Sequence, residues 1–354
     1  MNPRINRLGK IIDDLSLDAI LVWNLTNVHY LSGFTGSEAA LVVSKGKSFF
    51  ITDSRYTTQA SQQVTGFDFR ISYEKITLIA EALKEIAAKR IGYEDETLTV
   101  SNYRQVSGGT PGAEFIPLST RVDELRLHKD PEEIAIMRRS AWAAEVGLQN
   151  ALAILRPGVT EMEVAIELET GMRRAGALKP SFDTIVGSGP RGALPHGTAS
   201  DKVLEEGEMI VIDFGCILDG YCSDETVTVA LGRVGGEERK VYEIVRAAQE
   251  AAIAALAPGV SLREVDKVAR DYIGNAGFGQ YFGHGLGHGV GLEIHEGPRV
   301  STKTEAVAEP GMVVTIEPGI YLPGRFGVRI EDTLLVNESG CEKITSFDKS
   351  FRKI

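Results

Sequence analysis

The sequence predicts an α+β protein with two domains. We expect a smaller N-terminal α/β domain and a larger C-terminal domain that contains one helix-plus-sheet unit twice. Three observations favour this fold class. The chain has 354 residues, more than a single domain usually holds. Its first third alternates short apolar runs with turn residues, and its remainder contains two similar segments about a hundred residues apart. We place the boundary between residues 1–122 and 123–354.

The N-terminal domain is predicted from alternating helix and strand patterns. Apolar residues at helical spacing predict helices over residues 3–14 and 75–89. Between them, "ALVVSKGKSFFIT" at residues 40–52 has two apolar runs around Gly46, which is typical of a β-hairpin. Helices mixed with a hairpin indicate an α/β domain.

A long helix is predicted at the start of the C-terminal domain. Asp130 is a suitable N-cap, Pro131 occupies the first helical position, and Glu133 stands three residues after the cap. The helical pattern continues until Pro157 and Gly158 end it.

The C-terminal domain contains an internal repeat. "LRPGVTEMEV" at 155–164 resembles "LAPGVSLREV" at 256–265, and each carries a predicted capping box, Thr160 with Glu163 and Ser261 with Glu264. "GEMIVIDFG" at 207–215 parallels "GMVVTIEPG" at 311–319, and "SDETVTV" at 223–229 parallels "IEDTLLV" at 330–336. Duplicated units of this kind pack about a pseudo-twofold axis with their sheets joined, so we expect a site on the concave face between them.

Composition excludes several classes of function. The formal net charge of −11 argues against a broad electrostatic grip on nucleic acid. No segment approaches the run of about 18 apolar residues that a membrane span needs, and the amino terminus lacks the uninterrupted apolar run of a signal peptide. We therefore expect a cytoplasmic protein that acts on small molecules or peptides, without nucleic-acid or membrane partners.

Carboxylates occupy matching points of the repeat, Asp213 against Glu317 and Asp224 against Glu331. A buried carboxylate must be paired, protonated or bound to a metal, because burying it bare is costly. Four such groups near one axis would repel one another unless cations bind them. Two divalent ions held about 3.5–4 Å apart by bridging carboxylates would satisfy this arrangement. Oxygen-rich sites with one imidazole suit manganese, cobalt or zinc.

The segment "FGHGLGHGVGLEIHEG" at 282–297 lies between these acids. Glycine costs a helix about 1 kcal/mol per residue relative to alanine, so an extended ribbon is expected here. Strict alternation would place His284, Leu286, His288 and Val290 on one side of that ribbon.

With these motifs, the sequence resembles the prolidase and aminopeptidase P group of metallopeptidases, the pita-bread family that also contains methionine aminopeptidase. The resemblance covers nearly the whole chain. It rests on "NLTNVHYLSGFTGS" and "DSRYTTQA" in the first domain, and on "LPHGT", "DFG", "CSDET", "GHGVGLEIHEGP", "IEPGIY" and "VRIEDT" in the second. It implies a C-terminal pita-bread catalytic domain preceded by a creatinase/prolidase-type N-terminal domain.

The resemblance implies a role for each candidate residue. The metal pair would be bound by Asp213, Asp224, His288, Glu317 and Glu331, with Asp224 and Glu331 bridging. A water or hydroxide between the ions would be the nucleophile, and Glu317 would shuttle the proton.

Other residues match positions around the substrate in this family. His196 and His295 would steady the scissile amide and the developing oxyanion. Arg299 would neutralise the carboxy terminus of a dipeptide, although an exposed arginine at the rim explains the same residue equally well. The proline-side pocket would be lined by His284, Tyr321 and Arg329.

The implied function is hydrolysis of the Xaa-Pro bond at the N-terminus of dipeptides or short peptides by a homodimer. Manganese is the first expectation for the metal, with cobalt or zinc as alternatives. Whether the enzyme is an Xaa-Pro dipeptidase or an Xaa-Pro aminopeptidase stays open. A specificity like that of methionine aminopeptidase and a catalytically inactive peptide-binding module are further alternatives. In one departure from the family pattern, Val227 stands where many relatives have arginine, so whatever that arginine braces must be supplied otherwise.

Overall fold

The computed structural model describes residues 3–354 and divides the chain into two compact units, one ending at Arg126 and one spanning Leu127–Ile354. The division falls after Arg126 rather than after residue 122. Hydrogen bonds explain the difference, because they tie the intervening residues to the first unit: Asn27 Nδ2 donates to Asp123 Oδ1 at 2.8 Å, and the Tyr30 hydroxyl donates to the Leu125 carbonyl at 2.7 Å. No helix among the described residues combines the length and the hydropathy of a membrane span.

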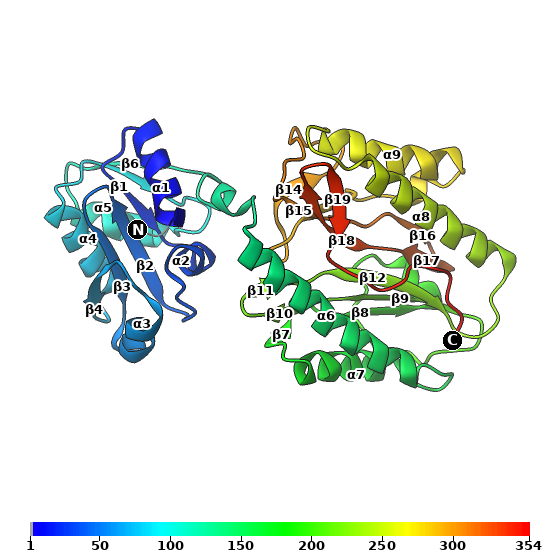
Figure 1. The fold of residues 1–354 in the computed structure, drawn as a ribbon. Helices are drawn as coiled ribbons and strands as arrows, with labels where there is room; N and C mark the ends of the chain where they lie inside the picture. Colours follow the sequence, from blue (N-terminus) through cyan, green and yellow to red (C-terminus); the bar gives the residue numbers. More distant parts are fainter. Residues whose placement is uncertain (1–2) are drawn as a thin grey trace. The chain divides into compact units, whose positions relative to one another are not determined.

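The first unit is built on a six-stranded mixed sheet with the strand order β4-β3-β2-β1-β5-β6. Its strands are β1 (Ala19–Val22), β2 (Ala39–Ser44), β3 (Ser48–Thr52), β4 (Asp68–Ile71), β5 (Arg90–Tyr93) and β6 (Glu114–Pro117). Its helices are α1 (Pro3–Asp14), α2 (Leu25–Ser32), α3 (Thr57–Gln63), α4 (Lys75–Glu85) and α5 (Val100–Gly109). Helices α4 and α5 pack against one face of the sheet, and α1 and α2 lie on the other side (Figure 1).

Two predictions in the first unit can be compared with these elements. The hairpin around Gly46 is confirmed, because β2 and β3 pair antiparallel on either side of it. The helix predicted over 75–89 is too long at its end, since α4 stops at Glu85. Ala87 has a φ of 51°, which no α-helix accommodates, and the chain enters β5 at Arg90.

The second unit begins with α6 (Pro131–Ile154), the predicted long helix, and continues with α7 (Glu161–Arg174). The capping boxes predicted at Asp130 and Thr160 are both formed. The second half has the equivalent helices α8 (Gly236–Ala255) and α9 (Leu262–Asn275). The capping box predicted at Ser261 is wrong, because the Glu264 amide donates to the Ser261 carbonyl at 2.9 Å instead of to its side chain.

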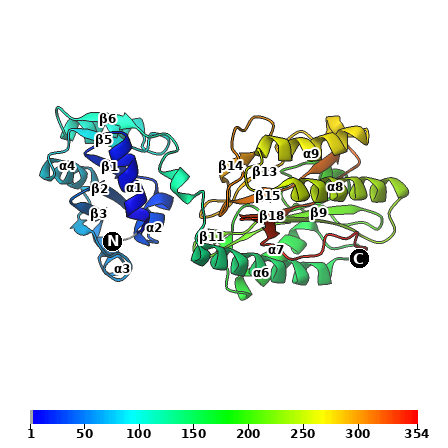
Figure 2. The same ribbon diagram turned by 45° about the horizontal axis from the view of Figure 1, so that its top comes forward.

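The sheets of the second unit lie between these two helix pairs, with α6 and α7 on one side and α8 and α9 on the other (Figures 1 and 2). A three-stranded sheet has the order β12-β9-β8, and a five-stranded sheet has the order β14-β13-β15-β18-β19. Their strands are β8 (Ile185–Ser188), β9 (Met209–Phe214), β12 (Glu225–Ala230), β13 (Gly287–Gly289), β14 (Glu296–Val300), β15 (Val313–Ile316), β18 (Asp332–Asn337) and β19 (Gly340–Lys343). The strands outside these two sheets are β7 (Lys179–Pro180), β10 (Cys216–Leu218), β11 (Tyr221–Cys222), β16 (Gly319–Leu322) and β17 (Phe326–Arg329).

The two halves repeat one arrangement. Strands β9 and β12 pair antiparallel in the first half, as β15 and β18 do in the second. Where the halves meet, the Glu331 amide donates to the Thr226 carbonyl at 3.1 Å and so links β12 to the start of β18. Each half also buries its own apolar core under its own helix pair. The acids near the strand ends converge where the two halves meet and line one cavity.

Candidate metal centre

Every residue that the sequence analysis selects for the site lines one cavity of about 530 Å³ in the second unit. These residues are His196, Asp213, Asp224, His284, His288, His295, Arg299, Glu317, Tyr321, Arg329 and Glu331. They come from both halves of the repeat, and the strand ends bring them together. The cavity is also lined by Phe182, Ile185 and Ile294, which give it an apolar wall.

Four carboxylates meet at the floor of this cavity. Asp213 lies in β9, Asp224 directly precedes β12, Glu317 directly follows β15, and Glu331 directly precedes β18. Burial raises the pKa of Asp224 well above its ordinary value, and the charges of Glu331 and Asp213 raise it further. Burial likewise raises the pKa of Glu317 to about 8 and that of Glu331 well above its usual range. The protein alone thus does not stabilise four negative charges here.

His288 faces this cluster in a defined orientation. Its Nδ1 lies 3.0 Å from the Gly289 carbonyl, which fixes the proton on that nitrogen. Its Nε2 points the other way, 3.5 Å from Asp224 Oδ2 and 3.4 Å from Glu317 Oε1. Burial lowers the pKa of His288 to about 3, so the ring is neutral and Nε2 carries a lone pair. A backbone carbonyl that orients an imidazole in this way is typical of a metal ligand.

The donor set fits a divalent cation. Asp224, His288 and Glu331 each offer a ligand atom, and these atoms lie within 4.8 Å of one another. Asp213 Oδ1 is buried and has no hydrogen-bond partner among the described residues. An unpartnered buried carboxylate oxygen beside two further carboxylates and a neutral imidazole is an arrangement that a bound metal would satisfy.

Arg329 connects this cluster to the neighbouring pocket. It forms an ion pair with Asp213 and donates from Nη1 to the Tyr321 hydroxyl at 2.9 Å. The Tyr321 hydroxyl in turn lies 2.9 Å from His284 Nε2. Both Arg329 and Tyr321 are buried, so the three side chains form one ordered wall of the cavity.

The remaining candidates are more exposed. His196 lies on the loop between β8 and β9, and its neighbour Pro195 accepts a hydrogen bond from Arg329 through its carbonyl at 3.1 Å. The ring of His295 meets that of His288 edge to face, with 4.3 Å between the ring centres. Arg299 lies in β14 with its side chain exposed at the cavity.

The glycine-rich ribbon is extended only in part. Residues Gly287–Gly289 form β13, and the strand register shifts between His288 and Gly289. The strict alternation predicted for the ribbon is therefore wrong: His288 lines the cavity, whereas Leu286 and Val290 are fully buried in apolar clusters. The expected close backbone approach does occur, because a Cβ on Gly287 would lie 1.9 Å from the Thr315 carbonyl oxygen.

Sequence reasoning missed two threonines that contact the carboxylates. The Thr226 hydroxyl donates to Glu331 Oε2 at 2.7 Å, and the Thr315 hydroxyl donates to Glu317 Oε1 at 3.3 Å. Each lies two residues from a candidate acid in the sequence, Thr226 after Asp224 and Thr315 before Glu317. Strand alternation places residues two apart on the same face, so this signal was available.

Val227 is buried in the apolar core of the first half, opposite Ile212 on β9. Alternation along β12 directs its side chain to the same face as that of Glu225. The cation that pairs with Glu225 comes from elsewhere in the chain, from Lys349.

Similarity to known proteins extends over nearly the whole chain. The model of metallopeptidase family M24 matches residues 135–338, and that of the creatinase/prolidase N-terminal domain matches residues 4–128. An Xaa-Pro dipeptidase from Pyrococcus furiosus is 38% identical over 99% of both chains. The solved structure of an Xaa-Pro dipeptidase from Bacillus anthracis is 43% identical, with a TM-score of 0.97 over 99% of both chains. That of an X-Pro aminopeptidase from Thermotoga maritima is 39% identical, with a TM-score of 0.92 over 99% of this chain and 100% of the other.

Proposed function

The chain belongs to metallopeptidase family M24, and we propose that it hydrolyses the bond between an N-terminal residue and a following proline in dipeptides or short peptides. The family matches confirm the predicted family and the predicted fold class, a pita-bread domain preceded by a creatinase/prolidase-type domain. The observation that carries the proposal is the cluster of buried carboxylates around the neutral imidazole of His288. Relatives named for Xaa-Pro cleavage supply the substrate class.

Two divalent cations would be held by Asp213, Asp224, His288, Glu317 and Glu331. Bound there, they would act as Lewis acids that lower the pKa of a water molecule and polarise the scissile carbonyl. Manganese is our first expectation, with cobalt and zinc as alternatives.

The side chains of the protein have separate roles in this proposal. Glu317 accepts a proton from the attacking water and passes it to the leaving nitrogen of proline. His196 and His295 donate hydrogen bonds to the scissile amide and to the oxygen on which negative charge develops. Arg329 orients Asp213 by pairing with its Oδ2.

Proline explains why a dedicated pocket is needed. Its nitrogen carries no hydrogen to donate, and its ring fixes φ, so an Xaa-Pro bond fits poorly into clefts that bind extended backbone. In the proposed pocket the flat faces of His284 and Tyr321 flank the pyrrolidine ring, and their mutual hydrogen bond at 2.9 Å holds that wall in place.

The test is an assay of Ala-Pro, Gly-Pro and Ala-Pro-Ala in parallel, with Ala-Ala as the control and with manganese or cobalt added after dialysis. Cleavage of the proline peptides alone is expected. Cleavage of the two dipeptides without the tripeptide identifies a dipeptidase, and cleavage of all three identifies an aminopeptidase. Loss of metal together with the absence of hydrolysis is what a metal-free peptide-binding module predicts. A protein that neither rebinds metal nor cleaves any peptide would contradict the proposal.

A further inference from the structure

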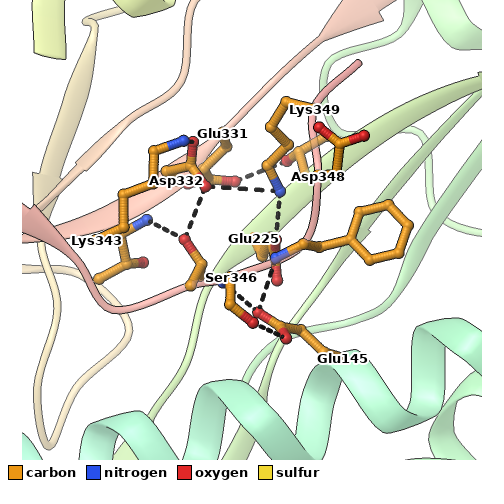
Figure 3. Close-up of polar contacts among 12 residues, drawn as sticks. Glu145, Glu225, Glu331, Asp332, Lys343, Ser346, Asp348 and Lys349 are labelled. Atoms are coloured by element: carbon orange, nitrogen blue, oxygen red, sulfur yellow. Dashed lines mark hydrogen bonds and ion pairs between the residues drawn. The ribbon is translucent and has the colours of Figure 1, made fainter. Parts of the chain in front are cut away.

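We propose that Lys349 is a positioning residue for the metal centre, because it pairs with both Glu225 and Asp332 and so fixes the two strands that carry Asp224 and Glu331 (Figure 3). The inference rests on the proposed function, since it concerns the same centre. It adds a residue from the C-terminal segment, which lines no part of the cavity.

Two adjacent acids stand at the start of each of these strands. Asp224 and Glu331 directly precede β12 and β18, and Glu225 and Asp332 are the first residues of those strands. Successive side chains of a strand point to opposite faces. Asp224 and Glu331 line the cavity, whereas Glu225 and Asp332 do not. The second acid of each pair therefore lies behind the centre, where Glu225 is 1% exposed and Asp332 is fully buried.

One cation lies between these two rear acids. Lys349 Nζ contacts Glu225 Oε1 and lies 3.8 Å from Asp332 Oδ1, and the lysine side chain is itself only 6% exposed. Burial acts to lower the pKa of Lys349, but the two carboxylates outweigh it, so the pKa is raised and the ammonium stays charged. Glu225 Oε2 is buried without a partner among the described residues, so the hydrogen bond that this carboxylate receives comes from Lys349.

The segment that carries Lys349 is attached to helices of both halves. Ser346 donates from its amide and its hydroxyl to Glu145 of α6, each at 2.5 Å (Figure 3). The Tyr242 hydroxyl of α8 donates to the Lys349 carbonyl at 3.1 Å. Contacts with a helix of each half thus fix the position of the segment that carries Lys349.

The strands that it joins are also in direct contact. The Thr333 hydroxyl of β18 donates to the Asp224 carbonyl at 2.7 Å. Metal ligation tolerates errors in ligand position of only about 0.2 Å. Loss of the cation would leave Glu225 buried without a charged partner and Asp332 with Lys343 alone, so the link between the two strands that sets the spacing of Asp224 and Glu331 would be lost.

The experiment measures metal binding by the full-length chain. Co²⁺ is titrated into metal-free protein by calorimetry, and the visible absorption bands of bound Co²⁺ report the ligand geometry. We expect Lys349→Met to weaken Co²⁺ binding by about 10- to 100-fold and to change the absorption bands. Lys349→Arg keeps the charge and is expected to restore most of the affinity.

Lys343→Met is the matched control. Lys343 Nζ lies 2.6 Å from Asp332 Oδ2, but its side chain is 46% exposed and pairs with one strand only. We expect wild-type Co²⁺ affinity and wild-type bands from this variant. Thermal unfolding of each metal-free variant shows whether a loss of stability alone accounts for a change in affinity.

The outcomes separate the two proposals. Wild-type affinity and bands in a folded Lys349→Met variant would overturn the role of Lys349. If that variant does not fold, Glu225→Gln replaces it, because the amide still accepts a hydrogen bond from Lys349 while the ion pair is lost. Unchanged Co²⁺ binding by Glu225→Gln would equally overturn the inference. A wild-type protein that binds no Co²⁺ would overturn the proposed function itself, and the inference with it.

Discussion

Glu94→Gln should remove most of the pH dependence of stability of the first unit between pH 5 and pH 8. Glu94 directly follows β5 and is only 3% exposed. Its Oε2 accepts hydrogen bonds from the amides of Trp23 at 2.5 Å and Asn24 at 2.7 Å, and its Oε1 accepts one from Asn27 Nδ2 at 2.5 Å. Burial outweighs these hydrogen bonds and raises the pKa of Glu94 from 4.5 to about 7.

The direction in which stability changes with pH follows from the folded-state and unfolded-state pKa values of Glu94. A folded-state pKa above the unfolded value of 4.5 means that the folded protein binds more protons across this window. The stabilisation is therefore complete below pH 4.5 and is lost as the pH rises through 7. One pKa unit corresponds to about 1.4 kcal/mol, so Glu94 makes the free energy of unfolding about 2–3 kcal/mol lower at pH 8 than at pH 5.

The assay is urea unfolding followed by tryptophan fluorescence. The chain has two tryptophans, and Trp142 is 58% exposed, so Trp142→Phe leaves Trp23 as a reporter of the first unit at little cost. In that background we compare Glu94 with Glu94→Gln, which keeps an acceptor for the two amides but does not ionise. The difference in unfolding free energy between the two proteins should change by about 2–3 kcal/mol from pH 5 to pH 8. A difference that stays constant over this range would refute the reasoning.

Three further predictions concern the second unit. Glu331→Gln removes one member of the Asp224, His288 and Glu331 group, and mass spectrometry of the dialysed protein should show reduced metal content in a folded chain. Arg299→Met should raise KM for Ala-Pro by about tenfold and leave KM for Ala-Pro-Ala unchanged; equal effects on both peptides would contradict a contact with the dipeptide carboxylate. Gly287→Ala places a Cβ 1.9 Å from the Thr315 carbonyl oxygen and should destabilise the second unit by about 1–3 kcal/mol in urea unfolding. Gly283→Ala, which has nothing within 4 Å, is the control and should have little effect.

The positions of the acids were predictable because the sequence repeats. Asp213 and Glu317, like Asp224 and Glu331, recur at equivalent points of two strand patterns, and burial at such points has few physical solutions. Contacts between residues close in the sequence were also predicted correctly, as in the capping box of Asp130 with Glu133. The roles of the site residues stay predictions until metal binding and catalysis are measured.

Contacts between residues far apart in the sequence could not be predicted in this way. The ion pair of Arg329 with Asp213 and that of Lys349 with Glu225 join residues more than a hundred positions apart, and no periodic pattern marks either pair. Equivalent sequences also diverge in detail. Thr160 caps its helix with its side chain, whereas Ser261 satisfies the same amide with its carbonyl, so one motif gave two geometries.

The division of the carboxylates between the two halves has a consequence for biosynthesis. Asp224 leaves the ribosome before Glu331, and the 106 residues between them take roughly 5 to 20 seconds to translate. At the start of that interval the nascent chain holds two acids, and His288 and Glu317 are added only later in it, so the set of donors stays incomplete until Glu331 is synthesised. In the proposed function, metal loading would thus be a late event that follows the joining of both halves, and the binding free energy would stabilise the finished second unit as a whole.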